Sequence, residues 1–171
     1  MRETYIPAIE VRKASIATIQ VDAVVNPANS FGYMGGGVAE VMKKVGGQVI
    51  EDEAVAAAPI QVGEAVATSA GDLVCKKVIH APTMHNPGEK ADAQAIGCAV
   101  EAALEVAEKE GCRSLAIPGM GTGVGGLGKD EAAKAIVGKI KGKRFEHLQL
   151  IILLDVDDEM VKAFEKALGK K

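Results

Sequence analysis

The 171-residue sequence predicts a single α/β domain, spanning residues 1–171, in which helices cover both faces of a central sheet. Short apolar runs alternate with amphipathic segments along the chain, an order typical of parallel strands joined by helices. With 48% hydrophobic residues, the chain is apolar enough to bury one sizeable core. Ligands of such folds bind at the carboxyl ends of the strands.

Two predicted strands precede the first predicted helix. Ala8 to Val11 alternates weakly and is expected at a sheet edge. Val21 to Val25 is a short apolar run that ends at Asn26, consistent with a buried strand. A helix is expected from Gly37, because valine and methionine recur at helical spacing until Gly46-Gly47 stops the pattern.

The later elements follow from similar signals. The segment from Asp92 to Lys109 predicts a helix because it is rich in Ala, Leu and Glu and ends before Gly111. Leu148 to Leu154 is the most apolar predicted strand. The other predicted elements are a helix from Gln48 to Ala58, strands from Glu64 to Ala70, from Lys77 to Ala81 and from Leu115 to Ile117, and helices from Lys129 to Lys141 and from Asp157 to Leu168.

The composition argues against several classes of partner. A net charge of −3 and an aromatic content of 3% do not suit a surface that neutralises many phosphates or stacks bases, so nucleic acid is not an expected partner. Three cysteines without a close pair fit buried thiols in a reducing compartment. No run approaches the roughly 18 apolar residues of a membrane span. We therefore expect a cytoplasmic protein without a membrane partner.

Two glycine-rich loops, residues 26–37 and 118–128, each lie between a predicted strand and a predicted helix. Neither loop contains Lys or Arg, so a bound anion would be held by backbone N–H groups at a helix N-terminus. This favours a small phosphorylated ligand. Either loop alone is explained equally well as a tight turn that uses glycine, but their joint occurrence at strand ends favours binding.

The second loop matches two other nucleotide-binding patterns in part. Gly121, Gly123 and Gly126 have the dinucleotide-binding spacing, which keeps an NAD(P)-linked oxidoreductase as a weaker alternative. The loop lies late in the chain, however, and the nearest acid, Glu146, precedes the next strand instead of ending it. Gly123 to Lys129 also resembles a Walker A loop, but Asp130 occupies the position of the Mg²⁺-binding hydroxyl.

The first loop carries a more specific resemblance. The run Val21-Asp22-Ala23-Val24-Val25-Asn26-Pro27-Ala28-Asn29, followed by Gly35-Gly36-Gly37-Val38-Ala39, resembles the signature of the macro domain family. Ile117-Pro118 with Gly121 to Gly126 is similar to the second diphosphate loop of that family. The resemblance implies a three-layer α/β/α sandwich with a mixed, mostly parallel sheet. It also implies a cleft between the two loops that binds ADP-ribose.

The resemblance assigns residues to parts of that ligand. Gly36, Gly37 and Val38 would offer amides near the distal ribose and the diphosphate, and Gly121 to Gly125 would surround the phosphates. Asn29 would hydrogen-bond the distal ribose, and it is the one candidate catalytic residue. An asparagine before a glycine loop is equally explained as a turn former bonded to local backbone. The full set of predicted ligand-binding residues is Ser15, Ile16, Asn26, Asn29, Gly35, Gly36, Gly37, Val38, Gly121, Thr122, Gly123, Val124, Gly125 and Asp155.

Departures from the family pattern fall at both ends of the ligand. Ser15 stands where many relatives have the Asp that accepts from the adenine amino group, and Leu154 stands where some have an aromatic residue. Gly125 replaces an aromatic residue that packs over the distal ribose in others. We expect Phe31 or Tyr33 to provide stacking or a lid; the alternative is that both pack beneath the loop.

These observations predict binding of ADP-ribose or a close derivative, by a recognition module or a slow processing enzyme that acts on ADP-ribosylated molecules. The alternative is a hydrolase of ADP-ribosyl esters, O-acetyl-ADP-ribose or ADP-ribose 1″-phosphate. Ala39 replaces the acid common in hydrolytic relatives, so Asn29 would position the substrate while the substrate's own phosphate activates water. No cofactor is expected, and the spacing of Cys75, His80 and His85 matches no zinc pattern.

Overall fold

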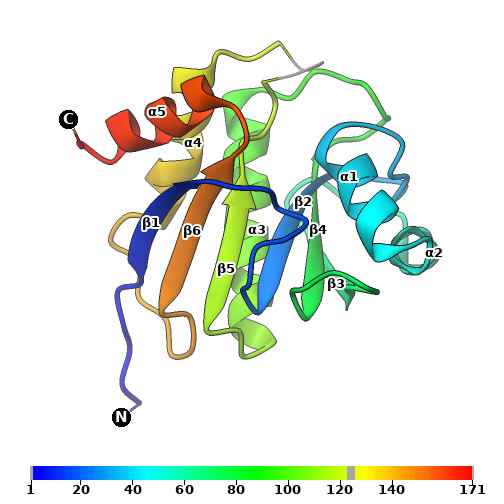
Figure 1. Ribbon diagram of the computed structural model, residues 1–171, viewed down its shortest axis with the longest axis horizontal. Coiled ribbons are helices and arrows are strands. Elements are labelled where there is room, and N and C mark those ends of the chain that lie inside the picture. The colour runs from blue at the N-terminus through cyan, green and yellow to red at the C-terminus, as the bar shows by residue number, and fades with distance from the viewer. Residues whose placement is uncertain (1, 123–125, 171) are drawn as a thin grey trace.

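A computed structural model describes residues 2–122 and 126–170 of the chain. Within these residues, six strands form one sheet in the order β1-β6-β5-β2-β4-β3, and five helices lie on its two faces (Figure 1). The strands are β1 (Ala8–Lys13), β2 (Ala23–Asn29), β3 (Val66–Ser69), β4 (Lys77–Met84), β5 (Ser114–Pro118) and β6 (Leu150–Asp155). The helices are α1 (Gly37–Gly46), α2 (Val49–Ala57), α3 (Ala93–Lys109), α4 (Lys129–Ile140) and α5 (Asp158–Ala167).

The sheet is parallel except at one edge. β1, β6, β5, β2 and β4 are parallel neighbours, whereas β3 pairs antiparallel with β4. The mixed, mostly parallel sheet is thus confirmed, and β1 lies at the opposite edge, as predicted. Because the five parallel strands run in one direction, the loops that follow them all emerge at one end of the sheet (Figure 1).

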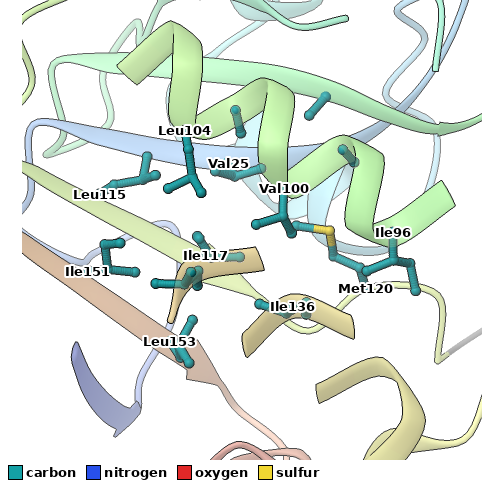
Figure 2. Packing of buried hydrophobic residues seen from close by; sticks show 14 of the residues in the cluster. Val25, Ile96, Val100, Leu104, Leu115, Ile117, Met120, Ile136, Ile151 and Leu153 are labelled. Carbon is teal, nitrogen blue, oxygen red and sulfur yellow. The ribbon is translucent and has the colours of Figure 1, made fainter. Parts of the chain in front are cut away.

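Helices α3, α4 and α5 cover one face of the sheet with the larger core. Val100 and Leu104 of α3 and Ile136 of α4 pack with inward residues of the central strands, including Leu115 and Ile151 (Figure 2). The other face carries a second cluster, in which Met42 of α1 and Ile50 of α2 are fully buried with strand residues. These layers form the expected α/β/α sandwich.

β2 and β4 are among the strands that run further than the sequence predicts, and each continues past a proline. β2 starts at Ala23 and runs through Pro27 to Asn29 instead of ending before Asn26. β4 continues through Pro82 to Met84 instead of ending at Ala81. Proline is tolerated because both strands have one partner there: β5 pairs only with the start of β2, and β3 pairs with β4 only as far as His80.

The five helix N-termini differ in their caps, and α2, whose N-cap is Gln48, has no side-chain cap hydrogen bond. α3 and α5 begin with aspartate caps: Asp92 accepts from the Ala95 amide and Asp157 from the Met160 amide. In contrast, α1 and α4, which follow the two glycine loops, have Gly36 and Gly128 as their N-cap residues, and glycine has no side chain to act as a cap. Their first backbone N–H groups therefore lack the side-chain acceptor that α3 and α5 supply themselves.

Candidate functional site

The first glycine loop presents bare backbone at the carboxyl end of β2. Gly35, Gly36 and Gly37 are all exposed, and a Cβ atom added to any of them would meet no heavy atom within 4 Å. Gly37 has a φ of +59°, a conformation that favours glycine. The loop therefore offers an open backbone surface at the start of α1.

The start of α1 has the electrostatic character of an anion site. Gly36 is its N-cap and provides no side-chain oxygen, and Val38 lies in the first turn. Backbone N–H groups and the positive end of the helix dipole favour negative charge there. The charged side chain in the first turn is that of Glu40, which is acidic, so an anion at this helix start would be attracted by the backbone and not by a cationic side chain of that turn.

Asn29 makes three hydrogen bonds to the loop that follows it. Its Oδ1 accepts from the amides of Phe31 (3.0 Å) and Tyr33 (3.3 Å), and its Nδ2 donates to the Tyr33 carbonyl (2.8 Å). The side chain thus has the local bonds of a turn former. A carboxamide nitrogen carries two hydrogens, and one is used here. The contact to ribose stays a prediction.

Asn26 lies deeper, in a buried chain of polar groups. Its Nδ2 is 3.1 Å from His80 Nδ1, and His80 Nε2 is 2.9 Å from Thr68 Oγ1, which donates to the Ser69 carbonyl. The chain is consistent with a proton on Nε2 of His80. Burial lowers the pKa of His80 to about 4, so the imidazole is neutral. Asn26 Oδ1 is buried and has no hydrogen-bond partner among the described residues.

An aromatic group stands beside Asn29. The rings of Phe31 and Tyr33 are stacked at 6.2 Å, and Phe31 lies 5.2 Å from the His85 ring. Ser30 Oγ is 2.8 Å from His85 Nδ1, and the Ser30 amide donates to the His85 carbonyl. These bonds join the first loop to the segment after β4. Tyr33 is 54% exposed, so the alternative that both rings pack beneath the loop is wrong for Tyr33.

The described part of the second loop is anchored on α3. Gly121 has a φ of +74°, and a Cβ there would lie 2.8 Å from Ile96 Cδ1. Its carbonyl accepts from the Leu127 amide (2.9 Å), which closes the loop, and Thr122 is half-buried. The predicted phosphate contacts of Gly123, Val124 and Gly125 fall outside the described residues.

Lys129, the residue that resembles a Walker A lysine, is engaged elsewhere. Its Nζ lies 2.7 Å from Asp157 Oδ2 and 2.9 Å from Glu159 Oε2, at the start of α5. These carboxylates raise the pKa of Lys129. The lysine therefore ties the first turn of α4 to α5, and the Walker A interpretation loses the charge that it requires.

The structure brings Ser15 close to Asp155 through the backbone only. The Ala14 amide donates to the Asp155 carbonyl (3.1 Å), which places the turn after β1 beside the end of β6. Ser15 Oγ accepts from the Ala17 amide (3.2 Å), and Ile16 is buried in the core beneath α1 and α2.

The Asp155 side chain lies on the face of the sheet that α3, α4 and α5 cover, opposite to the face on which Ile16 is buried. Its Oδ1 accepts from the Asp157 amide (3.0 Å), and its Oδ2 would lie 2.7 Å from a Cβ on Gly119. Strand alternation agrees, because Leu153 lies in the larger core and Leu154 in the smaller. Base recognition by Ser15, Ile16 and Asp155 stays a prediction.

One residue at the site carries no signal in the local sequence. Glu51 of α2 accepts a hydrogen bond from the Met34 amide (2.6 Å), immediately before Gly35. The two residues are 17 positions apart, and only the packing of α2 against the first loop brings them together. The Met34 hydrogen bond is the main cause that lowers the pKa of Glu51.

Two features are absent from residues 2–122 and 126–170. No cluster of three or more His, Cys, Asp or Glu side chains there is arranged to hold a metal ion. None of the helices in those ranges has the length and hydropathy needed to cross a membrane.

Solved structures share this fold. The Trypanosoma brucei macrodomain in complex with ADP-ribose superposes with a TM-score of 0.81 at 24% identity, covering 94% of this chain and 69% of that chain. The Oceanobacillus iheyensis macrodomain with MES bound gives a TM-score of 0.83 at 16% identity, covering 99% and 97%.

Sequence relatives match over nearly the same length. An uncharacterized protein of Aquifex aeolicus is 53% identical over 161 residues, which cover 94% of this chain and 98% of that protein. An uncharacterized protein of Aeropyrum pernix is 42% identical, covering 92% and 84%. The family model described as Macro domain matches residues 25–136, which include both glycine loops. The chain therefore belongs to the Macro domain family.

Proposed function

We propose that this protein binds ADP-ribose, or a derivative that keeps its diphosphate, between the two glycine-rich loops and acts as a recognition module. The diphosphate would lie on the exposed backbone of Gly35, Gly36 and Gly37 at the start of α1. The loop that begins at Gly121 would approach it from the other side.

One observation carries the proposal: both helices that follow the glycine loops have glycine at the N-cap, so no N-cap side chain occupies the start of either helix. A diphosphate has oxygens enough to accept from several backbone N–H groups, and helix N-termini favour such anions. Because Lys129 is paired with Asp157 and Glu159, we assign the binding of phosphate to neutral backbone groups.

Family membership supports the choice of ligand. The Trypanosoma brucei macrodomain, which shares this fold, forms a complex with ADP-ribose. Asn29 is the last residue of β2, and Gly36 and Gly121 lie in the loops that follow β2 and β5; ligands of parallel sheets bind beyond the carboxyl ends of the strands.

The competing functions have less support. The sheet order differs from the 3-2-1-4-5-6 order of a dinucleotide-binding oxidoreductase, since β1 lies at an edge. For a hydrolase, Ala39 supplies a buried methyl group where a general base would be expected, and the Asn29 side chain is bonded to its own loop. We therefore expect binding without rapid turnover.

Titration calorimetry with ADP-ribose, ADP, AMP and NAD tests the proposal. We expect ADP-ribose and ADP to bind at least about tenfold more tightly than AMP, because each backbone hydrogen bond to a charged oxygen contributes about 1.5 kcal/mol or more. Equal affinities for AMP and ADP would contradict a diphosphate site. Tighter binding of NAD than of ADP-ribose would favour the oxidoreductase.

A glutamate at position 36 locates the site. Gly36→Glu should abolish binding of ADP-ribose while the fold is retained, because the added side chain enters open space and repels phosphate. Gly138→Glu is the matched control, since it adds the same charge in open space near the far end of α4 and should leave affinity unchanged. If Gly36→Glu binds as tightly as the parent, the ligand lies elsewhere.

A further inference from the structure

A single peptide group in the first glycine loop is held from both sides. The Tyr33 carbonyl accepts from Asn29 Nδ2 (2.8 Å), and the Met34 amide of the same peptide donates to Glu51 Oε2 (2.6 Å). Asn29 lies at the end of β2, whereas Glu51 lies on α2. The plane of this peptide therefore depends on two side chains from different elements.

The Glu51 carboxylate is itself held in a fixed position. Gln48 Nε2 donates to Oε1 (2.7 Å), and Lys43 Nζ of α1 lies 3.3 Å from Oε2. The Glu51 side chain is only 15% exposed, so its bonds compete little with water. Because Met34 lowers the pKa of this group, the carboxylate is charged at neutral pH.

The same helix also contacts the loop one turn further on. Gly32 has a φ of +81°, and a Cβ there would lie 2.7 Å from the backbone carbon and oxygen of Ala54 in α2. The Ile60 amide, after α2, donates to the Ser30 carbonyl (2.8 Å). Backbone contact and the Glu51 bond thus join the loop to α2 at several points.

From this arrangement we infer that Glu51 is a positioning residue for the first glycine loop. By fixing the Tyr33–Met34 peptide, it sets the direction in which the next residues, Gly35 to Gly37, present their amides. It also keeps the Tyr33 carbonyl where Asn29 bonds it. The consequence for ligand affinity rests on the proposed function, whereas the effect on the loop does not.

Amide spectroscopy of the ligand-free protein tests the effect on the loop. In Glu51→Ala we expect the Met34 amide to lose protection from hydrogen exchange and the resonances of Gly35, Gly36 and Gly37 to shift. Glu51→Gln keeps an acceptor of the same length and should restore the parent pattern. Glu53→Ala is the matched control, because Glu53 lies on the same helix but bonds to Ser69.

Glu51→Asp keeps the charge but is shorter by one methylene, and it gives the same test should the alanine variant not fold. Loss of Met34 protection in either short variant, with recovery in Glu51→Gln, supports the inference. Parent-like exchange at Met34 and unshifted glycine resonances in a folded short variant overturn it.

Titration with ADP-ribose then separates this inference from the proposed function. We expect Glu51→Ala to bind about tenfold more weakly and Glu51→Gln within about threefold of the parent, as for one lost hydrogen bond to a charged group. A parent that does not bind ADP-ribose refutes the proposed function, and the exchange data still decide the role of Glu51. Unchanged affinity in Glu51→Ala with a displaced loop would show that the loop does not carry the ligand.

Discussion

His80 is a fully buried titratable residue whose imidazole has a partner on each nitrogen. Asn26 and Thr68 can both bond a neutral ring with its proton on Nε2, and a second proton would have to displace the donated bond from Asn26. The core of this protein therefore depends on His80 staying unprotonated.

This arrangement predicts a pH dependence of stability. The pKa of His80 is about 4 in the folded state against 6.5 as the ordinary value, so the unfolded chain takes up the proton first as the pH falls. The free energy of unfolding is therefore not reduced by this group above pH 6.5. It falls by about 3 kcal/mol as the pH drops from there toward about 4. Urea unfolding of the parent and of His80→Gln across this range should show a shallower decline for the variant.

His147→Gln is the control for this measurement, because His147 is exposed and its backbone amide donates to Glu108. The control should keep the decline of the parent. If His80→Gln loses stability as steeply as the parent between these pH values, His80 is not the group responsible.

Individual residue roles were only partly predictable from the sequence. For Asn29 the sequence offered a ribose contact and a turn former, and the structure displays the bonds of the latter without testing the former. The direction of the Asp155 side chain depends on β6 extending one residue beyond the predicted end at Leu154, which the sequence alone did not reveal. Glu51 could not be found because its partner is distant in sequence.

At the scale of elements, α2 packs against the first loop and helps to fix its position. Gly32 allows this close approach, because any side chain there would meet the backbone of Ala54. α2 also packs into the smaller core through Ile50, which is fully buried. The position of the loop is thus tied to the packing of a helix that contributes no predicted ligand contact.

Gly32→Ala is expected to lower the free energy of unfolding by more than about 2 kcal/mol, since left-handed backbone and a backbone clash add together. Gly63→Ala isolates the first contribution: its φ is +100° but the space around it is open, so about 1–2 kcal/mol should be lost. Denaturant unfolding of both variants measures the difference. Equal losses would show that the approach of α2 adds nothing.

The order of elements was predictable, and their ends were predictable where a local signal exists. Asp92 and Gly111 mark the two ends of α3. The predicted ends of β2 and β4 were wrong. Proline has no backbone N–H, so Pro27 and Pro82 would stop a strand only where a neighbouring strand needs that missing donor. Whether a neighbour is present depends on the assembled sheet.

At the scale of the whole molecule, the net charge of the protein does not assist the proposed binding of phosphate. The protein carries a net charge of −3, and neither glycine loop contains Lys or Arg. A diphosphate would therefore be drawn in by short-range backbone dipoles, against a weak overall repulsion.

Binding through backbone dipoles predicts a weak salt dependence. Raising NaCl from about 0.05 to about 0.3 M should change the affinity for ADP-ribose by less than about threefold, because screening acts chiefly on exposed charges. Calorimetry at the two salt concentrations provides the measurement. A loss of tenfold or more would point to cationic side chains such as Lys43 or Lys129 at the phosphates.

The family could be predicted from the sequence because its motifs sit in the parts of the chain that local rules describe well. The run from Val21 to Asn29 and the triple glycine combine a buried strand, a turn and a helix start in fixed order. What stayed beyond sequence reasoning is how segments far apart in the chain meet, as Glu51 meets Met34.

The two borders of the sheet are protected in different ways. β3 is only four residues long and so exposes few unpaired backbone groups. β1 is longer, but its outer positions carry Glu10 and Arg12, which bond to each other, and Lys13. Short or charged borders discourage strand-to-strand aggregation. Edge strands of this kind disfavour self-association through the sheet and leave the end that carries the glycine loops available for binding.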